Sequence, residues 1–444
     1  MAAAEPPAPV APSGDPLITL QRRLSVAVLV GLIALSALVA TAARPVPLGA
    51  EEIPADVELL GELSYRAWDG EGRAARAVDW NVVLGTGNCC ESLVRVAADG
   101  TIYDFGGNEL HLSRDSGASW SRIDTTLVLG AEGDLGIAPN GDVVALTWDP
   151  YTGDRIVAVR WTAADRVWRQ QEILLNTPFY DRPWLAVVPG ADTATGYRVV
   201  VRSGYALNPG YLVSDDGLAY TAALRLLASR DPLGPLASSG WVGSAQAQAH
   251  RSAGMIPLGD GRLLLAADLA LACSSRLHVL EVDGAFSCLG EQAGPLAGWH
   301  VMDDRGTLYA AEFEPSGQIS LRHSTTQGTT STLLALPMLG MEVRGDGDLD
   351  IKTTADGDRV VIAGHAQDPD GNSHVLVWDL RRVGASYDVT RIVELGRGDG
   401  AFGTNASGGT RLDFPSVGIL PDGRLVASFR DAELAEMALA IESR

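Results

Sequence analysis

Short apolar segments alternate with glycine-containing turns from about residue 55 to the C-terminal end of the chain. In each repeat, an apolar segment, a turn with glycine and a second apolar segment follow one another, as in a β-hairpin. No long amphipathic helical pattern occurs after residue 60, so an all-β fold is predicted. The repeats begin at seven places, namely Ser92, Leu135, Trp184, Ala253, Trp299, Ile351 and Val417.

The turn glycines of these repeats set their period. Successive glycines lie 41, 55, 65, 45, 51 and 66 residues apart, at Gly100, Gly141, Gly196, Gly261, Gly306, Gly357 and Gly423. Repeats of roughly 40 to 50 residues are typical of four-stranded propeller blades. The pattern therefore predicts a β-propeller of seven four-stranded blades, with six as the alternative, and the two longest gaps leave room for insertions at 228–251 and 384–411.

Further apolar segments supply the outer strands of the predicted blades. Pairs of such segments follow three of the repeats, at 155–161 with 167–174, at 277–282 with 286–289, and at 374–379 with 387–395. After the last repeat, one segment alone remains, at 437–442. We expect residues 57–68 to complete that blade, because a strand from the N-terminal side would close the ring and leave no free sheet edge.

The stretch 113–120, S-R-D-S-G-A-S-W, fits the pattern S-x-D-x-G-x-x-W at every fixed position. An aspartate can accept hydrogen bonds from backbone N–H groups, a glycine tolerates positive φ, and a tryptophan can anchor the following strand. The pattern therefore predicts a tight turn between two strands, built on Ser113, Asp115, Gly117 and Trp120.

This stretch resembles the Asp box, or BNR repeat, of sialidase-like β-propellers. A weaker copy at 213–220 keeps Asp215, Gly217 and the aromatic Tyr220, and a third at 324–331 keeps Ser324 and Gly328. In that family the box lies on the outside of a blade, away from the central pocket. The resemblance therefore indicates a fold more than a reaction.

Propellers bind ligands at their axial mouth, around the starts of the innermost strands. Charged and aromatic residues near those starts are the ligand-binding candidates, namely Tyr180, Asp181, Arg182, His250, Arg251, His300, Asp350, Arg411 and Asp413. The segment D-R-P-W-L-A-V from Asp181 also looks like one that recurs in bacterial sialidase-like repeat proteins. The alternative interpretation is that these residues are solvated loop charges or ion pairs between blades.

A sialidase-like reaction has requirements that the sequence meets only in part. The resemblance implies three arginines on the substrate carboxylate, a tyrosine nucleophile with a glutamate, and an aspartate acid/base. The first of these arginines sits in an F/Y-R-I-P motif, but here Tyr65-Arg66 continues with Ala67-Trp68. We therefore assign no catalytic residue. We expect a carbohydrate- or protein-binding module, with a divergent sialidase-like glycoside hydrolase or a scaffold for a membrane complex as alternatives.

The N-terminal region carries an uncharged apolar run of 20 residues, 24–43, directly after Arg22 and Arg23. Such a run can span a bilayer, and the positive-inside rule places residues 1–23 in the cytoplasm as a disordered leader. We expect a transmembrane anchor, then a Pro-containing tether at 44–54 and the propeller at 55–444. A secretory signal cut after the A-T-A sequence at 40–42 is the alternative. The propeller then faces the periplasm or the extracellular side of the cell membrane, or is secreted.

The charge composition of the chain argues against some classes of binding partner. The formal net charge is −21, and 34 basic residues include a single lysine, Lys352. Such an acidic chain is a poor partner for nucleic acid or an anionic membrane surface. The preference for arginine and alanine is typical of a bacterial protein.

Cysteines and acidic turns suggest two further features. Cys273 and Cys288 flank a predicted hairpin and are a candidate disulfide in an oxidising compartment. The adjacent Cys89 and Cys90 are either free thiols or a strained pair. No cofactor is expected, although the alternating oxygen ligands of Asp368, Asp370 and Asn372 are calcium candidates, with a plain β-turn as the alternative.

Overall fold

Every secondary-structure element that the computed structural model describes is a β-strand, as the sequence predicts. Residues 47–444 form one compact unit. The described residues are 47–444, except 85–92, 107–108, 128, 131–132, 149–154, 175–182, 191, 204–210, 223–254, 259–260, 267–276, 281–285, 289–298, 315, 326–331, 343–348, 399–414 and 432–435.

Four antiparallel sheets are each built from consecutive strands of the chain. They are β13–β16 (Pro183–Pro189, Tyr197–Ser203, Tyr211–Ser214, Thr221–Ala222), β17–β20 (Met255–Pro257, Leu263–Ala266, Leu277–Leu280, Phe286–Cys288), β21–β24 (Trp299–Met302, Thr307–Phe313, Ile319–Thr325, Thr332–Ala335) and β25–β28 (Leu349–Thr353, Arg359–Gln367, Ser373–Val383, Ser386–Gly398). The short strand β3 (Ala67–Trp68) pairs with β28 at the outer edge of the last of these sheets.

Two more sheets combine strands from distant parts of the chain. One has the order β5-β6-β7-β8-β1-β12-β11-β10-β9 (Leu93–Val96, Ile102–Gly106, Glu109–Ser113, Ser121–Asp124, Leu48–Pro54, Val167–Leu174, Arg155–Thr162, Val143–Trp148, Gly133–Ile137). The other has the order β2-β4-β31-β30-β29 (Glu58–Tyr65, Val78–Leu84, Glu436–Glu442, Leu425–Asp431, Ser416–Ile419).

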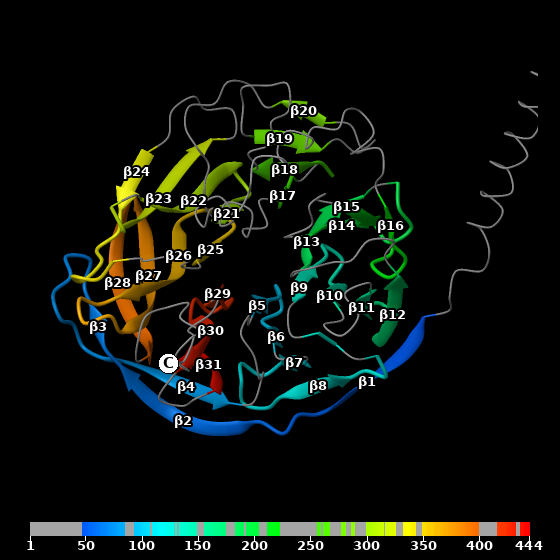
Figure 1. Cartoon of the computed structure of the whole chain (residues 1–444), viewed down its shortest axis with the longest axis horizontal. Helices are drawn as coiled ribbons and strands as arrows, with labels where there is room; N and C mark the ends of the chain where they lie inside the picture. Colours follow the sequence, from blue (N-terminus) through cyan, green and yellow to red (C-terminus); the bar gives the residue numbers. More distant parts are fainter. Residues whose placement is uncertain are drawn as a thin grey trace, which may run out of the picture. The chain divides into compact units, whose positions relative to one another are not determined.

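The first strands of the repeats form the inner layer of the fold. Each of β5, β9, β13, β17, β21, β25 and β29 contacts the next, and β29 contacts β5, so the contacts close on themselves. Figure 1 shows these strands around a common centre, with the other strands of each sheet farther out. This radial arrangement is that of a β-propeller. All seven predicted turn glycines have positive φ, which explains the choice of glycine there.

The strand that completes the last sheet differs from the prediction. β4 pairs directly with β31, with Val83 opposite Leu439, and β2 lies outside β4. Residues 57–68 are therefore not the closing strand, which is Val78–Leu84. The physical reason is burial, because alternate residues of β4, Trp80 and Val82, are fully buried whereas most of β2 is exposed.

Strand β1 differs from the prediction as well, because it lies inside the range expected to be a tether. Leu48–Ala50 pair with β12, and Glu51–Pro54 pair with β8. Arg114, which follows β7, holds β1 through a two-pronged ion pair with Glu52. One extended segment therefore bridges the outer edges of two neighbouring four-stranded units and merges them into the nine-stranded sheet.

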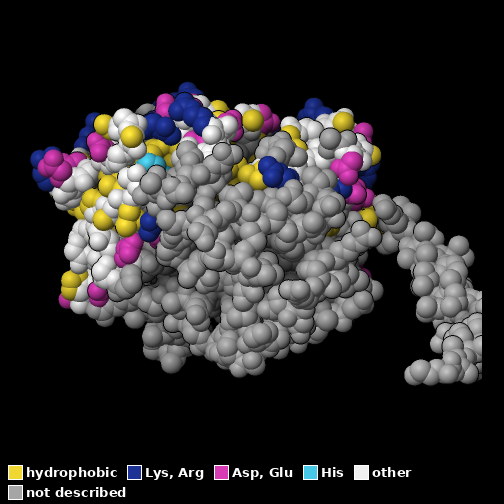
Figure 2. Space-filling model, turned by 90° about the horizontal axis from the view of Figure 1, so that it is seen from above, with side chains coloured by type: hydrophobic (Ala, Val, Ile, Leu, Met, Phe, Trp, Pro, Cys, Tyr) yellow, Lys and Arg dark blue, Asp and Glu magenta, His cyan; other side chains and the backbone are white. Residues whose placement is uncertain are grey.

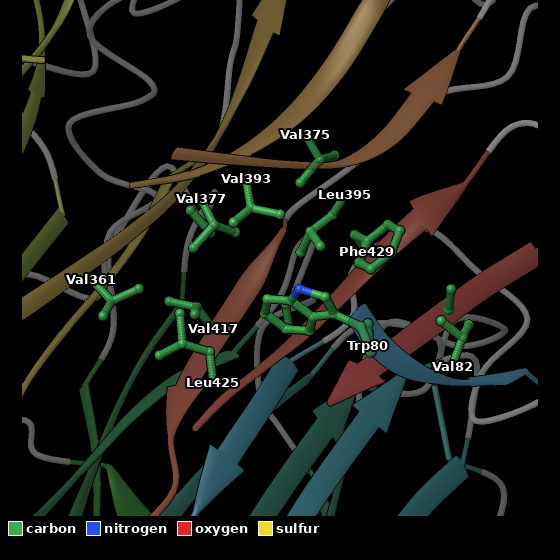
Figure 3. Close-up of a cluster of buried hydrophobic side chains, with 14 of the residues drawn as sticks. Trp80, Val82, Val361, Val375, Val377, Val393, Leu395, Val417, Leu425 and Phe429 are labelled. Atoms are coloured by element: carbon green, nitrogen blue, oxygen red, sulfur yellow. The ribbon is translucent and has the colours of Figure 1, made fainter. Parts of the chain in front are cut away.

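Apolar faces of adjacent sheets pack against each other. Between the β25–β28 sheet and the last sheet, Val361, Val377 and Val393 lie against Trp80 and Phe429, as Figure 3 shows. Trp80 and Phe429 are fully buried. Each valine comes from a different one of the neighbouring strands β26, β27 and β28, and the three side chains lie on one face of the sheet.

The turn at 113–120 has the hydrogen bonds that its sequence predicts. The Ser113 hydroxyl donates to Asp115 at 2.9 Å and accepts from the Gly117 amide at 2.8 Å. Asp115 also accepts from the Ser119 amide at 2.9 Å. Gly117 has a φ of 92°, and a Cβ there would lie 2.1 Å from Ile441 of β31, so the turn packs too closely for any other residue.

The turn at 213–220 is one residue shorter than the S-x-D-x-G-x-x-W pattern to which the sequence was matched. Its hydrogen bonds come from Ser214, whose hydroxyl accepts from the Gly217 amide at 2.8 Å, and from Asp216, which accepts from the Ala219 amide at 2.7 Å. Asp215, the predicted residue, instead accepts from Arg198 at 2.7 Å. The Tyr220 hydroxyl donates to the Gly217 carbonyl at 3.4 Å. The third predicted copy lies largely outside the described residues.

Several other predictions fall on residues that the structure does not describe. These are the apolar segment 24–43, Cys89, Cys90 and Cys273. Within the described ranges, no helix has the length and apolar character needed to cross a bilayer.

Candidate functional site

Charged side chains gather on the inner strands near the centre of the ring. Arg95 lies on β5, Asp134 on β9, and Asp350 and Lys352 on β25. Arg95 forms an ion pair with Asp134 at 3.3 Å, and Lys352 forms one with Asp350. The charges of Arg95 and Asp134 also act on Lys352. We call these four residues the axial cluster.

Asp134 joins two neighbouring inner strands. One carboxylate oxygen accepts the amide of the next residue, Leu135, at 2.8 Å. The other oxygen accepts the amide of Leu185 on β13, also at 2.8 Å. Both donors are backbone groups, so this carboxylate holds β9 and β13 in register.

Asp350 repeats this arrangement between β25 and β29. Its oxygens accept the amides of Ile351 and Val417, each at 3.0 Å, and the hydroxyl of Ser416 at 2.8 Å. Asp134 and Asp350 both lie seven residues before a turn glycine, Gly141 and Gly357. Leu185 and Val417 both lie two residues after a proline.

The cations of the axial cluster keep some exposure to solvent. Side-chain exposure is 25% for Arg95 and 22% for Lys352, whereas that of Asp134 is 2%. Burial lowers the pKa of the Lys352 amine to about 8, although Asp350 opposes the shift. Burial pushes the pKa of Asp350 upward, but the charges of Lys352 and Arg95 hold it below its usual value. At neutral pH the cluster therefore presents two partly accessible cations, one of them beside an ionised carboxylate.

His300, another predicted candidate, lies on β21 of the inner layer. It is six residues before Gly306, as Ile351 is six residues before Gly357, so both occupy the same level of the ring. Both ring nitrogens of His300 are buried, and neither has a hydrogen-bond partner among the described residues. Burial lowers its pKa to about 4, so the ring is neutral at neutral pH.

The remaining predicted ligand-binding residues lie outside the described residues. They are Tyr180, Asp181, Arg182, His250, Arg251, Arg411 and Asp413. The structure therefore brings together Asp350 with Lys352, Arg95 and Asp134. Of these, Arg95 and Asp134 were missed in the sequence, although an aspartate seven residues before a turn glycine is a signal that could have found Asp134.

Two tyrosine–aspartate–arginine groups lie beside the hairpin turns. The Tyr197 hydroxyl donates to Asp142 at 3.0 Å, and Arg160 donates to the same oxygen at 2.7 Å. Tyr309 donates to Asp303 at 2.8 Å. Burial raises the pKa of both tyrosines. A tyrosine nucleophile needs a lowered pKa instead. These groups therefore stabilise the packing of the blades and do not suit the nucleophilic step of a sialidase-like reaction.

The predicted calcium turn is held by its own hydrogen bonds. One oxygen of Asp368 accepts the amides of Asp370 at 3.0 Å and Asn372 at 2.8 Å. The other accepts the Asn372 side-chain amide at 3.0 Å and lies 3.2 Å from His374 Nε2. These donors lower the pKa of Asp368 to about 2, against the effect of burial. Within the part of the chain that is described, no three acidic, histidine or cysteine residues cluster as metal ligands.

Comparisons with known proteins find only distant similarity. No family model and no curated protein matches the chain. Among solved structures, an ancestral GH74 enzyme is similar with a TM-score of 0.46 and 14% identity, over 88% of this chain and 51% of the enzyme. A chain of a mitotic checkpoint complex has a TM-score of 0.43 and 9% identity, over 81% and 93%. The lectin SapL1, solved with α-methyl fucoside, has a TM-score of 0.36 and 9% identity, over 81% and 94%. At these values the similarities carry no argument about the ligand of this chain.

Proposed function

We propose that this protein is an exported, membrane-tethered propeller of seven blades, of the Asp-box sialidase-like type. Its function in this proposal is to bind a charged carbohydrate or protein segment at the axial mouth. The closed order of contacts among the inner strands supports seven blades. The turn at 113–120 supports the Asp-box type, and the apolar run 24–43 supports export.

The axial cluster is the observation that carries this proposal. Its carboxylates are fixed by backbone amides, so the positions of Arg95 and Lys352 beside them are fixed as well. Fixed groups lose little entropy when a ligand binds. Partly exposed cations on such a support suit a ligand with carboxylate, sulfate or hydroxyl oxygens.

Binding is better supported than hydrolysis. A glycosidase needs a carboxyl group that can donate a proton, usually one with a raised pKa. The pKa of Asp350 is lowered instead, and its oxygens are occupied by Ile351, Val417, Ser416 and Lys352. A scaffold would expose an apolar patch. The large exposed apolar side chains of the described residues come from five different strands, at Leu48, Leu59, Val167, Leu333 and Val383.

The test is a ligand screen with the full chain in detergent, on an array of neutral and acidic glycans and on acidic peptides. For any ligand found, Lys352→Gln should weaken the affinity about tenfold, the loss expected for one charge-assisted hydrogen bond. The matched control is Arg166→Gln, because Arg166 is an exposed residue in the turn between β11 and β12. Unchanged affinity in Lys352→Gln would refute the axial site, and turnover of a fluorogenic sialoside would favour the hydrolase.

A further inference from the structure

An open cavity of about 540 Å³ lies between the β25–β28 sheet and the last sheet, beside the hairpin turns. Gly423, the turn glycine between β29 and β30, lines it, and so does Arg359, two residues after the turn glycine Gly357. Of the axial cluster, Asp350 lies at the other end of β25, whereas Arg95 and Asp134 belong to β5 and β9, which do not line this cavity. We call this site the arginine cavity, because five of its lining residues are Arg359, Arg381, Arg391, Arg424 and Arg444.

The alternation of side chains along the strands explains how the cavity arises. Two residues from the core valine Val361, β26 carries Arg359, and two residues from Val393, β28 carries Arg391. On the opposing sheet, Glu442 follows the buried Ala440 by two residues. Side chains two apart share one face of a strand. The cavity is therefore the charged end of the apolar interface in Figure 3.

The deeper arginines are used to neutralise carboxylates. Arg359 donates two hydrogen bonds to Asp379, each of 2.8 Å. Arg391 donates to the same carboxylate at 3.3 Å and to Glu442. The carboxylates of Asp379 and Glu442 are thus occupied by Arg359 and Arg391, and Glu442 also accepts the Leu425 amide at 3.1 Å. Arg424 contacts Glu442 only at its backbone carbonyl, at 3.2 Å.

The outer part of the cavity has positive charge in excess. Arg381 stands directly opposite Arg359 in the β26–β27 ladder, an unfavourable pairing of like charges. Arg381 is exposed, and it has no ion-pair partner among the described residues. With Asp422 as the third lining carboxylate, five arginines face three acids. Figure 2 shows Lys and Arg side chains gathered among Asp and Glu along the upper edge of the described part.

We infer that the arginine cavity binds an oxyanion, that is, the sulfate, phosphate or carboxylate group of a small molecule. Guanidinium groups bind such groups through two parallel hydrogen bonds, and Arg381 has its donors available. Arg424, whose side chain is 14% exposed, lines the cavity and donates to Asp422 at 2.8 Å. On a chain of net charge −21, a local excess of cations also selects an anion that the rest of the surface repels. This inference does not depend on the proposed function.

The experiment is titration calorimetry of the full chain in detergent with sodium sulfate, sodium phosphate and sodium galacturonate, at constant ionic strength set by chloride. We expect saturable binding of at least one of these anions above the chloride background. Arg381→Gln should weaken it about tenfold, since one charge-assisted contact is lost. Arg424→Lys, which keeps the charge but removes the fork, should weaken sulfate binding by a smaller factor.

Arg166→Gln is the matched control, because it removes an exposed arginine far along the chain at the β11–β12 turn. A preference for galacturonate over sulfate would assign the site to acidic sugars, and the reverse preference to inorganic or ester oxyanions. Binding that is no stronger than that of chloride would overturn the inference, as would equal affinity in Arg381→Gln and the unmodified chain. Melting curves of each variant show whether it is folded.

Discussion

The axial cluster and the arginine cavity use the same residue types, and both reach the seam between the β25–β28 sheet and the last sheet. Asp350 joins β25 to β29 at one end of this seam, and the cavity lies beside the hairpin turns at the other end. In the axial cluster, each carboxylate accepts backbone amides from two inner strands, and two cations balance two carboxylates. In the arginine cavity, Asp379 accepts only arginine side chains, and cations outnumber acids. A carboxylate that accepts backbone amides joins neighbouring strands directly. A carboxylate that accepts only arginine side chains joins side chains, so the strands depend less on it.

This difference teaches which charges are available for ligands. Cations that are paired with amide-bound carboxylates are fixed in place, so the axial site is rigid and balanced. Cations beyond the paired layer, such as Arg381, are accessible and in excess. Among the described residues that line the cavity, Arg381 is the arginine without an ion-pair partner, so it can bind a ligand without first losing an ion pair.

The largest effect is expected where an amide-bound carboxylate is removed. Asp350→Ala leaves the Val417 amide and the Ser416 hydroxyl without their acceptor and Lys352 without its counter-charge. Breaking such a buried pair costs about 3–5 kcal/mol. Urea unfolding of the full chain should show this loss in the free energy of unfolding. A loss below about 1 kcal/mol would remove the distinction between the two ends.

Two arginines of the cavity should differ in their contribution to the free energy of unfolding, because one is paired and buried and the other is exposed. Arg359→Gln leaves the carboxylate of Asp379, which is 8% exposed, short of its two-pronged partner and should cost about 3 kcal/mol. Arg381→Gln, by contrast, should change the free energy of unfolding by less than about 0.5 kcal/mol, because it is exposed. The same unfolding curves measure both variants. Equal losses in the two would contradict the assignment of Arg381 as a free cation.

Two adjacent aspartates of the 213–220 turn differ in the same way, because only one of them accepts hydrogen bonds from backbone amides. Asp216 accepts the amides of Leu218 and Ala219, so Asp216→Ala should cost about 1–2 kcal/mol. Asp215→Ala removes only an exposed ion pair with Arg198 and should cost less than about 1 kcal/mol. Thermal melts of the two variants, compared with the unmodified chain, give the order. The reverse order would support the sequence-based assignment of Asp215 as the aspartate of this turn.

Much of the fold is predictable from local signals. The hairpins and their turn glycines follow from apolar alternation and from the need for positive φ, which act within a few residues. The closing strand was not predictable in this way, because its pairing with β31 joins residues more than 350 positions apart. Residues 57–68 and 78–84 are both apolar enough to pair with β31, and the second segment takes that position because it buries Trp80 and Val82.

The site is predictable only in part for the same reason. Asp350 was found because it opens an inner strand, but Arg95 and Asp134 belong to blades distant in sequence, and only the ring brings them near Lys352. The arginine cavity was not predicted at all. Its lining comes from β26, β27, β28, the turn before β30 and the C-terminal strand, so no contiguous motif marks it.

The smallest expected effect is a difference in how the free energy of unfolding depends on pH, between a variant of the axial cluster and a variant of the arginine cavity. Between pH 7 and 9 the folded chain loses the proton of Lys352, whose pKa burial lowers to about 8, while the unfolded chain keeps it. The unfolded state then binds more protons, so stability rises with pH, by about 1 kcal/mol over this interval. Lys352→Gln should abolish this rise relative to the unmodified chain, and Arg381→Gln should preserve it, because arginine does not titrate in this range. Urea unfolding at pH 7, 8 and 9 measures the three chains side by side. A rise that persists in Lys352→Gln would mean that another group is responsible and that burial does not lower the pKa of the axial lysine.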